Sequence, residues 1–362
     1  MTETPVSTSP VNGARSRDFH RLTVKRVEPL TSDSAAITLS VPDDLADAFA
    51  FAAGQSLTIR RGVERRSYSI CAQMGSAPRI GVREVAGGAV SGWLVHGLSV
   101  GDTLEVQVPS GTFTPDLSVP GHHVLIAAGS GITPMMSIAA SILAADAAST
   151  VTLLYGNRRS DTVMFADEVA DLKDAYPARM RIVHVLSREP QEVELFSGRL
   201  DAARLTELLP VTVDVAGVDH WWLCGPFGMV TDAIEVLRAL GVDSTRIHRE
   251  LFWVGDDPPV VATHEDAPVG DGAALTVVLD GRSSTLTLPA GTPILDGAQR
   301  SRPDLPFACK GGVCGTCRAK VVTGEAVMRR NYALEPHEVE SGYVLTCQAL
   351  PQTDEITVDY DA

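Results

Sequence analysis

Four cysteines have the spacing needed to hold an iron–sulfur cluster. Cys309, Cys314 and Cys317 form the pattern Cys-x4-Cys-x2-Cys, and Cys347 follows further along the chain. Four thiolates in this arrangement are the ligands of a [2Fe–2S] cluster, because two irons need four protein ligands. Three glycines lie between Cys309 and Cys317, and they let the backbone bring N–H groups close to the sulfurs. The spacing therefore predicts a [2Fe–2S] site.

Two other uses of these cysteines compete with the cluster. A zinc ribbon would need a second Cys-x2-Cys knuckle, whereas Cys347 stands alone in its stretch of sequence. Disulfides would fit a secreted protein, but the first residues lack the apolar core of a signal peptide. We favour the cluster over both alternatives.

The composition limits the class of protein. At 362 residues the chain is long enough for two or three domains. Its net charge of -15 excludes nucleic acid or an anionic membrane as the main partner, because both need a basic face. No apolar run approaches the roughly 18 residues needed to cross a bilayer. We expect a cytoplasmic protein in which the cysteines stay reduced.

Short strands without intervening helices follow a Ser- and Pro-rich tail over residues 1–17 that we expect to be disordered. Residues 18–117 alternate between apolar and polar side chains, with glycines at the turns. This pattern predicts a closed antiparallel β-barrel. The predicted strands are 20–27, 35–41, 56–60, 67–72, 80–85 and 103–108.

Two motifs in this region could bind a phosphorylated, flat cofactor. Arg66 can pair with a pyrophosphate, the Tyr68 ring can stack on a heterocycle, and the Ser69 hydroxyl can reach the edge of that heterocycle. The second motif is a glycine-rich helix start, whose N–H groups and one hydroxyl could cradle phosphate. Its residues are Gly87, Gly88 and Ser91.

Residues 118–253 change to strands alternating with helices, which predicts a parallel α/β sheet. The predicted strands are 123–128, 151–155, 180–186 and 221–224. After the first strand, Gly129, Gly131 and Thr133 open a helix, where N–H groups can bind the phosphates of a nucleotide. A proline replaces the third glycine of the usual dinucleotide fingerprint, so this motif is weak by itself.

The ends of the later strands suggest which nucleotide binds. Arg158 follows the second strand, and Ser187 and Arg188 follow the third. An arginine at this place accommodates a 2'-phosphate, so NADPH is preferred and NADH remains possible. The alternative is that these arginines are solvated loop charges. Cys224 ends the fourth strand before a Gly-Pro turn, whereas Cys71 is expected to be buried filler.

An acidic, proline-containing segment over residues 254–272 predicts a linker. The third domain, 273–362, begins with predicted strands 275–279 and 284–288 around Asp280-Gly281, which is a hairpin signal. A helix is predicted over 293–300, and the four cluster cysteines come after it.

Taken together, these motifs resemble the ferredoxin-NADP reductase family, with a C-terminal plant-type ferredoxin. The first domain carries the family's R-x-Y-S motif, the second its G-x-G-x-x-P form and a C-G-P turn. The resemblance implies that FAD, rather than FMN, lies on Tyr68 with Ser69 at N5. It also implies that Cys224 and Phe252 lie near the reacting rings, and that the ferredoxin has a β-grasp fold. One iron would take Cys309 and Cys314, and the other Cys317 and Cys347.

The implied function is a reductase that passes electrons from NADPH through a flavin and the cluster to another protein. The domain order is similar to that of reductase components of multicomponent oxygenases, especially the phenylacetyl-coenzyme A epoxidase reductases. That resemblance implies a separate di-iron oxygenase as partner, with a Rieske-type steroid or aromatic-ring hydroxylase as the alternative. A different possibility is a redox relay that takes no electrons from nicotinamide. We therefore expect Ser69 and Cys224 to be the catalytic residues.

Overall fold

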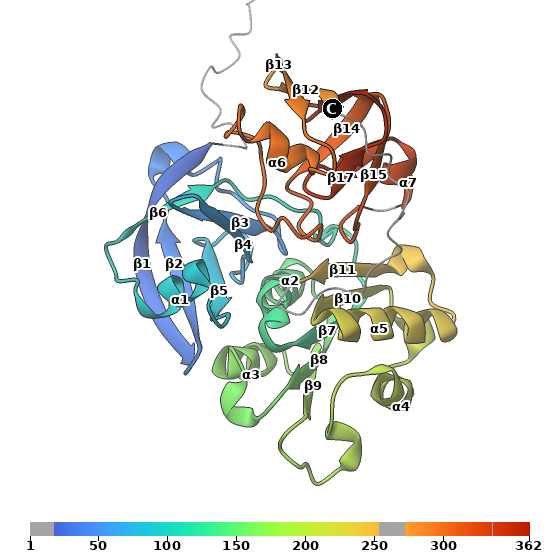
Figure 1. The fold of residues 1–362 in the computed structure, drawn as a ribbon. Coiled ribbons are helices and arrows are strands. Elements are labelled where there is room, and N and C mark those ends of the chain that lie inside the picture. The colour runs from blue at the N-terminus through green and yellow to red at the C-terminus, as the bar shows by residue number, and fades with distance from the viewer. Residues whose placement is uncertain (1–17, 253–271, 335) are drawn as a thin grey trace, which may run out of the picture.

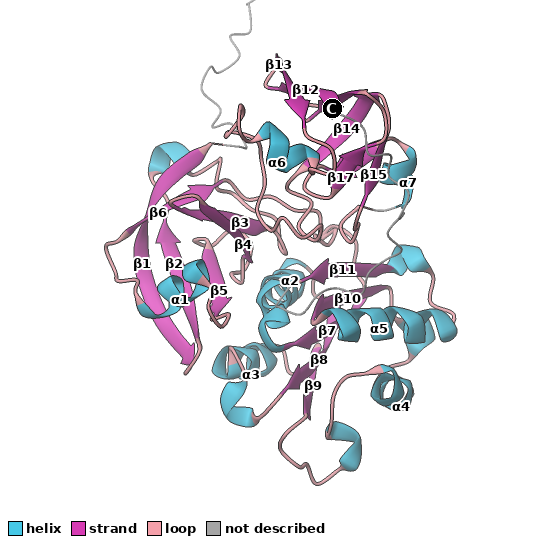
Figure 2. Cartoon of the chain, viewed as in Figure 1, coloured by secondary structure: helices cyan, strands magenta, loops and turns pink. Residues whose placement is uncertain are grey.

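The computed structural model describes residues 18–252 and 272–362, apart from residue 335. Three large sheets, and a two-stranded sheet over residues 326–328 and 349–351, form three neighbouring parts of the structure (Figures 1 and 2). The predicted tail and the predicted linker, except Gly272, lie outside these residues. Within the described ranges, no helix has the length and apolar character required to span a membrane.

The first part is an antiparallel sheet that closes into a barrel. Its strand order is β4-β3-β6-β1-β2-β5. A bridge between Ile70 and Ile80 joins the two edges, so the predicted closed barrel is confirmed. Apolar side chains such as Leu22, Ile37 and Leu57 alternate inward and are fully buried. The elements are β1 (Phe19–Thr31), β2 (Ser34–Ser40), β3 (Ser56–Arg61), β4 (Glu64–Ser69), β5 (Arg79–Arg83), α1 (Ala89–His96) and β6 (Thr103–Gln107).

The fourth strand of the barrel starts and ends earlier than the predicted 67–72. Gly62, with a φ of +61°, makes a tight β3–β4 turn, and so pairing begins at Glu64 opposite Arg61. Beyond Ser69 the chain crosses to β5 through the Ile70–Ile80 bridge. Ser69 therefore lies at the very end of its strand, at the rim of the barrel.

The second part is a parallel sheet with the order β11-β10-β7-β8-β9. The chain runs outward from β7 to β9 and then returns to place β10 on the other side of β7. This reversal creates a switch point between β7 and β10, where α/β sheets bind their ligands. The strands are β7 (His122–Ala128), β8 (Thr150–Asn157), β9 (Met180–Leu186), β10 (His220–Gly225) and β11 (Ile247–Leu251). The edge strand β11 was not predicted.

Helices cover both faces of this parallel sheet (Figure 1). One face packs on α2 and α3, and the other packs on α4 and α5. The core under α2 and α3 also includes Ala36, Cys71 and Phe113 from the barrel, which joins the two parts through buried apolar contacts. Cys71 is buried filler, as expected. The helices are α2 (Ile132–Ala145), α3 (Ala166–Ala175), α4 (Ala202–Thr212) and α5 (Phe227–Ala239).

The third part is a mixed sheet with the order β13-β12-β18-β14-β16. Its first and last strands, β12 and β18, pair in parallel at the centre, and the other pairs are antiparallel. This is the topology expected of a β-grasp ferredoxin, with α6 packed across the sheet (Figure 2). The elements are β12 (Ala273–Leu279), β13 (Arg282–Leu288), α6 (Ile294–Ala298), β14 (Arg318–Thr323), β15 (Ala326–Met328), α7 (Pro336–Glu340), β16 (Tyr343–Leu345), β17 (Ala349–Pro351) and β18 (Glu355–Asp359).

Candidate functional site: a junction of strand ends and a cysteine loop

The ends of β4, β10 and β11 meet at the boundary between the barrel and the parallel sheet. The Ser69 hydroxyl, which is buried, donates a hydrogen bond of 2.8 Å to the Glu250 carboxylate. Glu250 is paired in register with Cys224 on the neighbouring strand. The structure therefore brings Ser69 and Cys224, two residues singled out from the sequence, to the same junction. It adds Glu250 as a third member.

Burial sets the protonation of this junction. It raises the pKa of the Glu250 carboxyl to about 7, although the hydrogen bond from Ser69 acts in the opposite direction. Burial, followed by the charge of Glu250, also raises the pKa of the Cys224 thiol. Cys224 is thus a neutral thiol that packs against its surroundings, and it lacks the lowered pKa of a reactive thiolate. Glu250 is the group that changes charge near neutral pH.

The sequence patterns alone assign Glu250 no role beyond the stretch that closes the second domain. The available signal is an acidic residue in a strand-length segment directly before Phe252. Charged residues are rarely buried unless they are paired, so such a position is a candidate for chemistry. Phe252 itself follows β11 and packs on the core beneath α2.

The glycine loop after β7 lies against the end of β10. A Cβ atom at Gly131 would come within 2.1 Å of the Cys224 carbonyl oxygen, so only glycine allows this approach. The hydroxyl of Thr133 donates to the Ser130 carbonyl at 3.0 Å and is buried. The Tyr155 hydroxyl donates to the Gly129 carbonyl at 3.1 Å. The loop is thereby fixed at the switch point of the sheet.

The ends of β8 and β9 bring the three predicted 2'-phosphate residues together. The Arg188 N–H donates to the Arg158 carbonyl at 2.8 Å, and Ser187 donates to the Asn157 carbonyl at 2.9 Å. Both arginine side chains are exposed. Glu189 lies in the same place and accepts hydrogen bonds from the backbone and hydroxyl of Ser160. The ends of these strands therefore carry two exposed arginines, and the nearby Glu189 carboxylate is already hydrogen-bonded to Ser160.

The side chains of the barrel motif make contacts within the protein. Arg66 is half-exposed and forms an ion pair of 2.8 Å with Glu64. Tyr68 is partly buried, and this burial raises the pKa of its hydroxyl. The Ser91 hydroxyl turns inward, where it accepts the Val85 N–H at 3.1 Å.

Ser91 therefore stabilises its own loop. Its hydroxyl also lies 3.4 Å from the Gly88 carbonyl, and the preceding residue, Gly87, has a φ of +73°. The N–H groups at the start of α1 are the groups of this loop that could bind phosphate.

The four predicted cluster cysteines lie in two pairs. Cys314 is within hydrogen-bonding reach of Cys309, and Cys317 is within reach of Cys347. Contact with Cys314, together with backbone N–H groups of the loop, lowers the pKa of the Cys309 thiol to about 5. Contact with Cys317 lowers the pKa of the Cys347 thiol. These are the pairs that the resemblance assigns to the two irons, and that assignment stays a prediction.

The backbone of the cysteine loop is shaped to donate to sulfur. The Gly311 N–H donates to the Cys309 sulfur at 3.3 Å, and the Gln348 amide donates to the Cys347 sulfur at 3.7 Å. Gly312 and Gly315 have φ values of +80° and +67°. Lys310, not Gly311, is the third residue with a positive φ in the loop. Donors to thiolate sulfur stabilise the charged ligands that iron requires.

Within the described ranges, no three His, Cys, Asp or Glu residues converge on a point where one metal ion could be held. The cysteines instead form two facing pairs. Two thiolates for each of two irons is the donor set of a [2Fe–2S] cluster, so the residues present fit that group.

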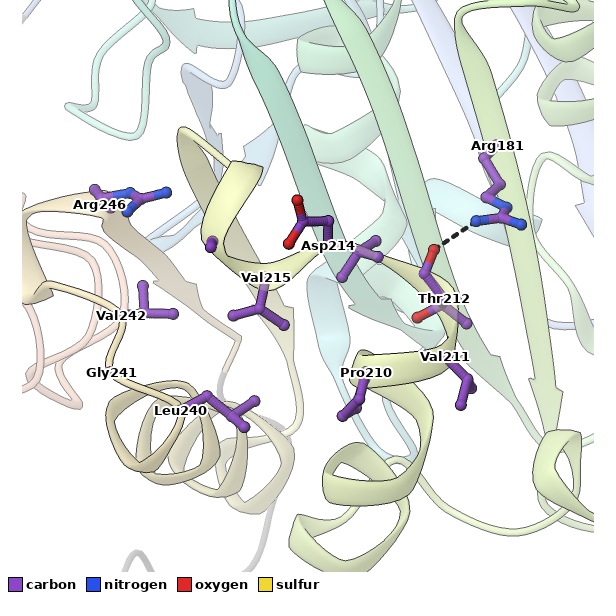
Figure 3. Close-up of a pocket in the computed structure, with 12 residues that line it drawn as sticks. Arg181, Pro210, Val211, Thr212, Asp214, Val215, Leu240, Gly241, Val242 and Arg246 are labelled. Carbon is purple, nitrogen blue, oxygen red and sulfur yellow. Dashed lines mark hydrogen bonds between the residues drawn. The ribbon is translucent and has the colours of Figure 1, made fainter.

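A large surface hollow lies away from this chemistry (Figure 3). It has a volume of about 900 Å³ and lies by the amino ends of β9 and β11, opposite the strand ends that carry Gly129 and Cys224. Arg181, Leu240 and Arg246 lie on its wall. The Arg181 guanidinium donates to the Thr212 carbonyl, so this charge is already used within the fold. We assign the hollow no role.

Comparison with known proteins identifies two of the three parts. Residues 125–235 match the family described as an oxidoreductase NAD-binding domain, and residues 277–352 match the 2Fe-2S iron-sulfur cluster binding domain. The second match covers the four cysteines.

Relatives extend over nearly the whole chain. A component of the 1,2-phenylacetyl-CoA epoxidase of Escherichia coli (strain K12) is 42% identical, and the match covers 95% of this chain and 98% of that protein. The ferredoxin reductase component of the 3-ketosteroid-9-alpha-monooxygenase of Rhodococcus rhodochrous is 34% identical, and the match covers 94% of this chain and 96% of that protein. The solved structure of phthalate dioxygenase reductase has the same fold, with a TM-score of 0.59, 24% identity and 94% and 98% covered.

We expect Gly312→Ala to lower the cluster content of the purified protein. Alanine at a φ of +80° costs roughly 1–2 kcal/mol. Its Cβ would also lie 3.1 Å from Gln348 Cγ and 3.2 Å from the Arg330 carbonyl. Iron and acid-labile sulfide per chain measure the effect.

Gly311→Ala is the matched control, because a Cβ there meets nothing closer than 3.8 Å and the residue has no positive φ. Equal iron content in the two variants would contradict this account of the loop.

Proposed function

The chain belongs to the family of ferredoxin-NADP reductase-type oxygenase reductases with a C-terminal [2Fe–2S] domain, and from this premise we propose that it carries electrons from NADPH through FAD and the cluster to a separate oxygenase. The junction of Ser69, Cys224 and Glu250 is the observation that carries the proposal. It joins the end of the strand with the flavin motif to the end of the strand beside the nucleotide loop.

The flavin supplies the conversion between a two-electron hydride donor and a one-electron cluster. Oxidation of one NADPH to NADP⁺ would release one proton and two electrons, and the electrons would pass through the cluster to the external acceptor one at a time. Arg66 would pair with the pyrophosphate, Tyr68 would stack on the ring system, and Ser69 would reach its edge. The N–H groups after Gly87 and Gly88, in the loop that Ser91 stabilises, would hold phosphate. FAD is preferred to FMN on family resemblance.

The nucleotide side uses the loop and strand ends of the parallel sheet. The N–H groups of the Gly129–Gly131 turn and the start of α2 would bind the pyrophosphate, with Thr133 fixing the turn. Arg158, Ser187 and Arg188 would bind the 2'-phosphate, which favours NADPH over NADH. Cys224 and Phe252 would pack near the nicotinamide and the flavin. The neutral thiol of Cys224 suits this contact, since it brings no charge to a hydride transfer.

The proposed partner is a di-iron oxygenase that acts on phenylacetyl-coenzyme A. Its support is the 42% identity to a component of the E. coli epoxidase over nearly the full length of both chains. The second candidate is a Rieske-type steroid or aromatic-ring hydroxylase, which the relative from Rhodococcus rhodochrous favours. A cytoplasmic location belongs to the same proposal, because none of the six cysteines forms a disulfide.

Reconstitution with a candidate oxygenase tests the partner. We expect NADPH oxidation in the presence of a di-iron phenylacetyl-coenzyme A epoxidase to rise on addition of phenylacetyl-coenzyme A and to stay at its basal rate with a 3-ketosteroid. Product formation that matches NADPH consumption would support the proposal. Coupling to the steroid hydroxylase alone would favour the second candidate. If NADPH does not bleach the flavin without oxygen, the reductase function itself fails.

Arg188→Ala should weaken the binding of NADPH far more than the binding of NADH. A guanidinium that pairs with the 2'-phosphate contributes about 1.5–3 kcal/mol through a charge-assisted hydrogen bond. The KM for NADPH should therefore rise at least roughly tenfold, while the KM for NADH changes little. Arg159→Ala is the control, because Arg159 is close in sequence but pairs with Asp161 at 3.2 Å. The same change for both nucleotides would remove the 2'-phosphate assignment.

Glu250 should control how flavin reduction depends on pH. Its carboxyl, with a pKa of about 7, is neutral below that pH and ionised above it. An ionised carboxylate opposes the negative charge that arrives with a hydride by roughly 1–2 kcal/mol. Bleaching of the flavin by NADPH should thus slow about four- to eightfold between pH 6 and pH 8. Glu250→Gln should keep the faster rate throughout.

The control for this profile is Glu105→Gln. Glu105 is an exposed carboxylate of the barrel that pairs with Arg60 at 2.9 Å. It should leave the profile unchanged. If flavin bleaching in Glu250→Gln still slows between pH 6 and pH 8, another group causes the pH dependence.

A further inference from the structure

Arg65, one residue before the flavin motif, reaches out of the barrel to the ferredoxin part. Its side chain is buried, with a relative exposure of 8%. The guanidinium donates to the carbonyl oxygens of Leu305 at 3.2 Å and Pro303 at 3.1 Å. Both carbonyls belong to the segment that leads into Cys309. Arg65 thus holds the approach to the cluster loop with two hydrogen bonds from one charged group.

Aromatic rings complete the setting of this guanidinium. Its carbon lies 4.5 Å from the centre of the Phe307 ring and 5.2 Å from that of Phe19. Phe19 belongs to the barrel, and Phe307 is two residues before Cys309. A desolvated guanidinium on aromatic faces gains cation–π stabilisation, which lysine reproduces only in part because it lacks the planar fork.

The charges around Arg65 favour its contact with the ferredoxin part. Burial lowers the pKa of Arg65, and the nearby charge of Arg60 acts in the same direction. Asp304, which lies between the two carbonyls, acts in the opposite direction. Asp304 is itself paired with Arg302 at 2.9 Å. The guanidinium remains charged at neutral pH and is compensated from the ferredoxin side.

A second contact joins the parallel-sheet part to the residues that hold the cysteine loop. Phe227, the first residue of α5, meets the Tyr332 ring edge-on, with the ring centres 5.2 Å apart. The Tyr332 N–H donates to the Gly312 carbonyl at 3.1 Å. Phe227 follows the turn after Cys224. The cluster loop is therefore held from the flavin side by Arg65 and from the nicotinamide side by Phe227.

We propose that Arg65 is a positioning residue for internal electron transfer, which fixes the cluster loop against the barrel so that single electrons pass from the flavin to the cluster. The proposal rests on the proposed electron route. β4 serves both cofactors, since Arg65 contacts the cluster segment while Arg66, Tyr68 and Ser69 form the flavin motif. Successive residues of a strand point to opposite faces, so Arg65 and Arg66 can serve different cofactors.

The test is anaerobic rapid mixing of the complete holoprotein with NADPH, in which flavin bleaching and cluster reduction are followed separately. Arg65→Met keeps the length of the side chain but removes its charge and donors. Loss of hydrogen bonds from a charged donor should lower the equilibrium constant for docking at least roughly tenfold. Cluster reduction should slow by that factor, while the rate of flavin bleaching and the iron content stay at wild-type values.

Two further variants separate positioning from folding. Arg65→Lys retains the charge and can donate to a carbonyl, so it should restore part of the rate. Arg179→Met is the matched control, because Arg179 also donates to backbone carbonyls and lies on a ring, that of Tyr176, but entirely within the parallel-sheet part. It should leave cluster reduction at the wild-type rate.

A structural readout accompanies the kinetics. Small-angle scattering of the oxidised holoprotein should give a larger radius of gyration for Arg65→Met than for the wild type. Should Arg65→Met lose iron, Arg65→Lys with full iron content must still show slower cluster reduction. Wild-type cluster reduction in an iron-replete Arg65 variant would overturn the proposal. Failure of NADPH to bleach the wild-type flavin would instead reject the proposed function.

Discussion

The hydrogen bond from Ser69 to Glu250 crosses the boundary between the barrel and the parallel sheet, and it holds together the two strand ends at which the proposed flavin and nicotinamide sites lie. It joins a residue at the rim of the barrel to a residue on the edge strand of the sheet, 181 positions later in the chain. Such a contact is possible only because the two parts already share a buried core, in which Ala36, Cys71 and Phe113 meet α2. Apolar burial fixes the relative position of the parts, and the polar contact then selects one alignment within it.

Burial of this contact also determines its chemistry. A carboxyl group removed from water becomes harder to ionise, and the hydroxyl of Ser69 offsets only part of that penalty. The same desolvation keeps Cys224 neutral. The junction therefore contains one group that titrates near neutrality and one that does not. These pKa shifts come from the packing of two parts, which no single strand could supply.

The predictability of each feature follows from how local its cause is. The strands β7 to β10 were predicted closely because buried parallel strands form continuous apolar runs. The four candidate cluster cysteines could be singled out because such a loop is defined by spacing. The edge strand β11 and its Glu250 were missed, since a half-buried edge lacks such a run and a glutamate by itself indicates solvent. The inward turn of the Ser91 hydroxyl and the positive φ of Lys310 depend on the folded loop, which sequence patterns do not describe.

The boundary between the barrel and the parallel sheet differs from the boundary of the ferredoxin part. The difference matches the proposed transfer across each, which is a hydride at the first and single electrons at the second. The barrel and the parallel sheet share an apolar core, and Arg79 adds a two-pronged ion pair to Glu168 at 2.6 and 2.8 Å. The ferredoxin core, among the described residues, contains side chains of that part alone. Its contacts with the rest include the two hydrogen bonds from Arg65 and the contact between the Phe227 and Tyr332 rings.

Hydride transfer requires reacting atoms at contact distance, so a rigid, apolar boundary suits it. Single electrons need no such contact between atoms, and interfaces of the polar kind permit relative motion of domains. A directional arginine contact is therefore sufficient at the second boundary, where it sets the approach of the cluster without merging the two cores.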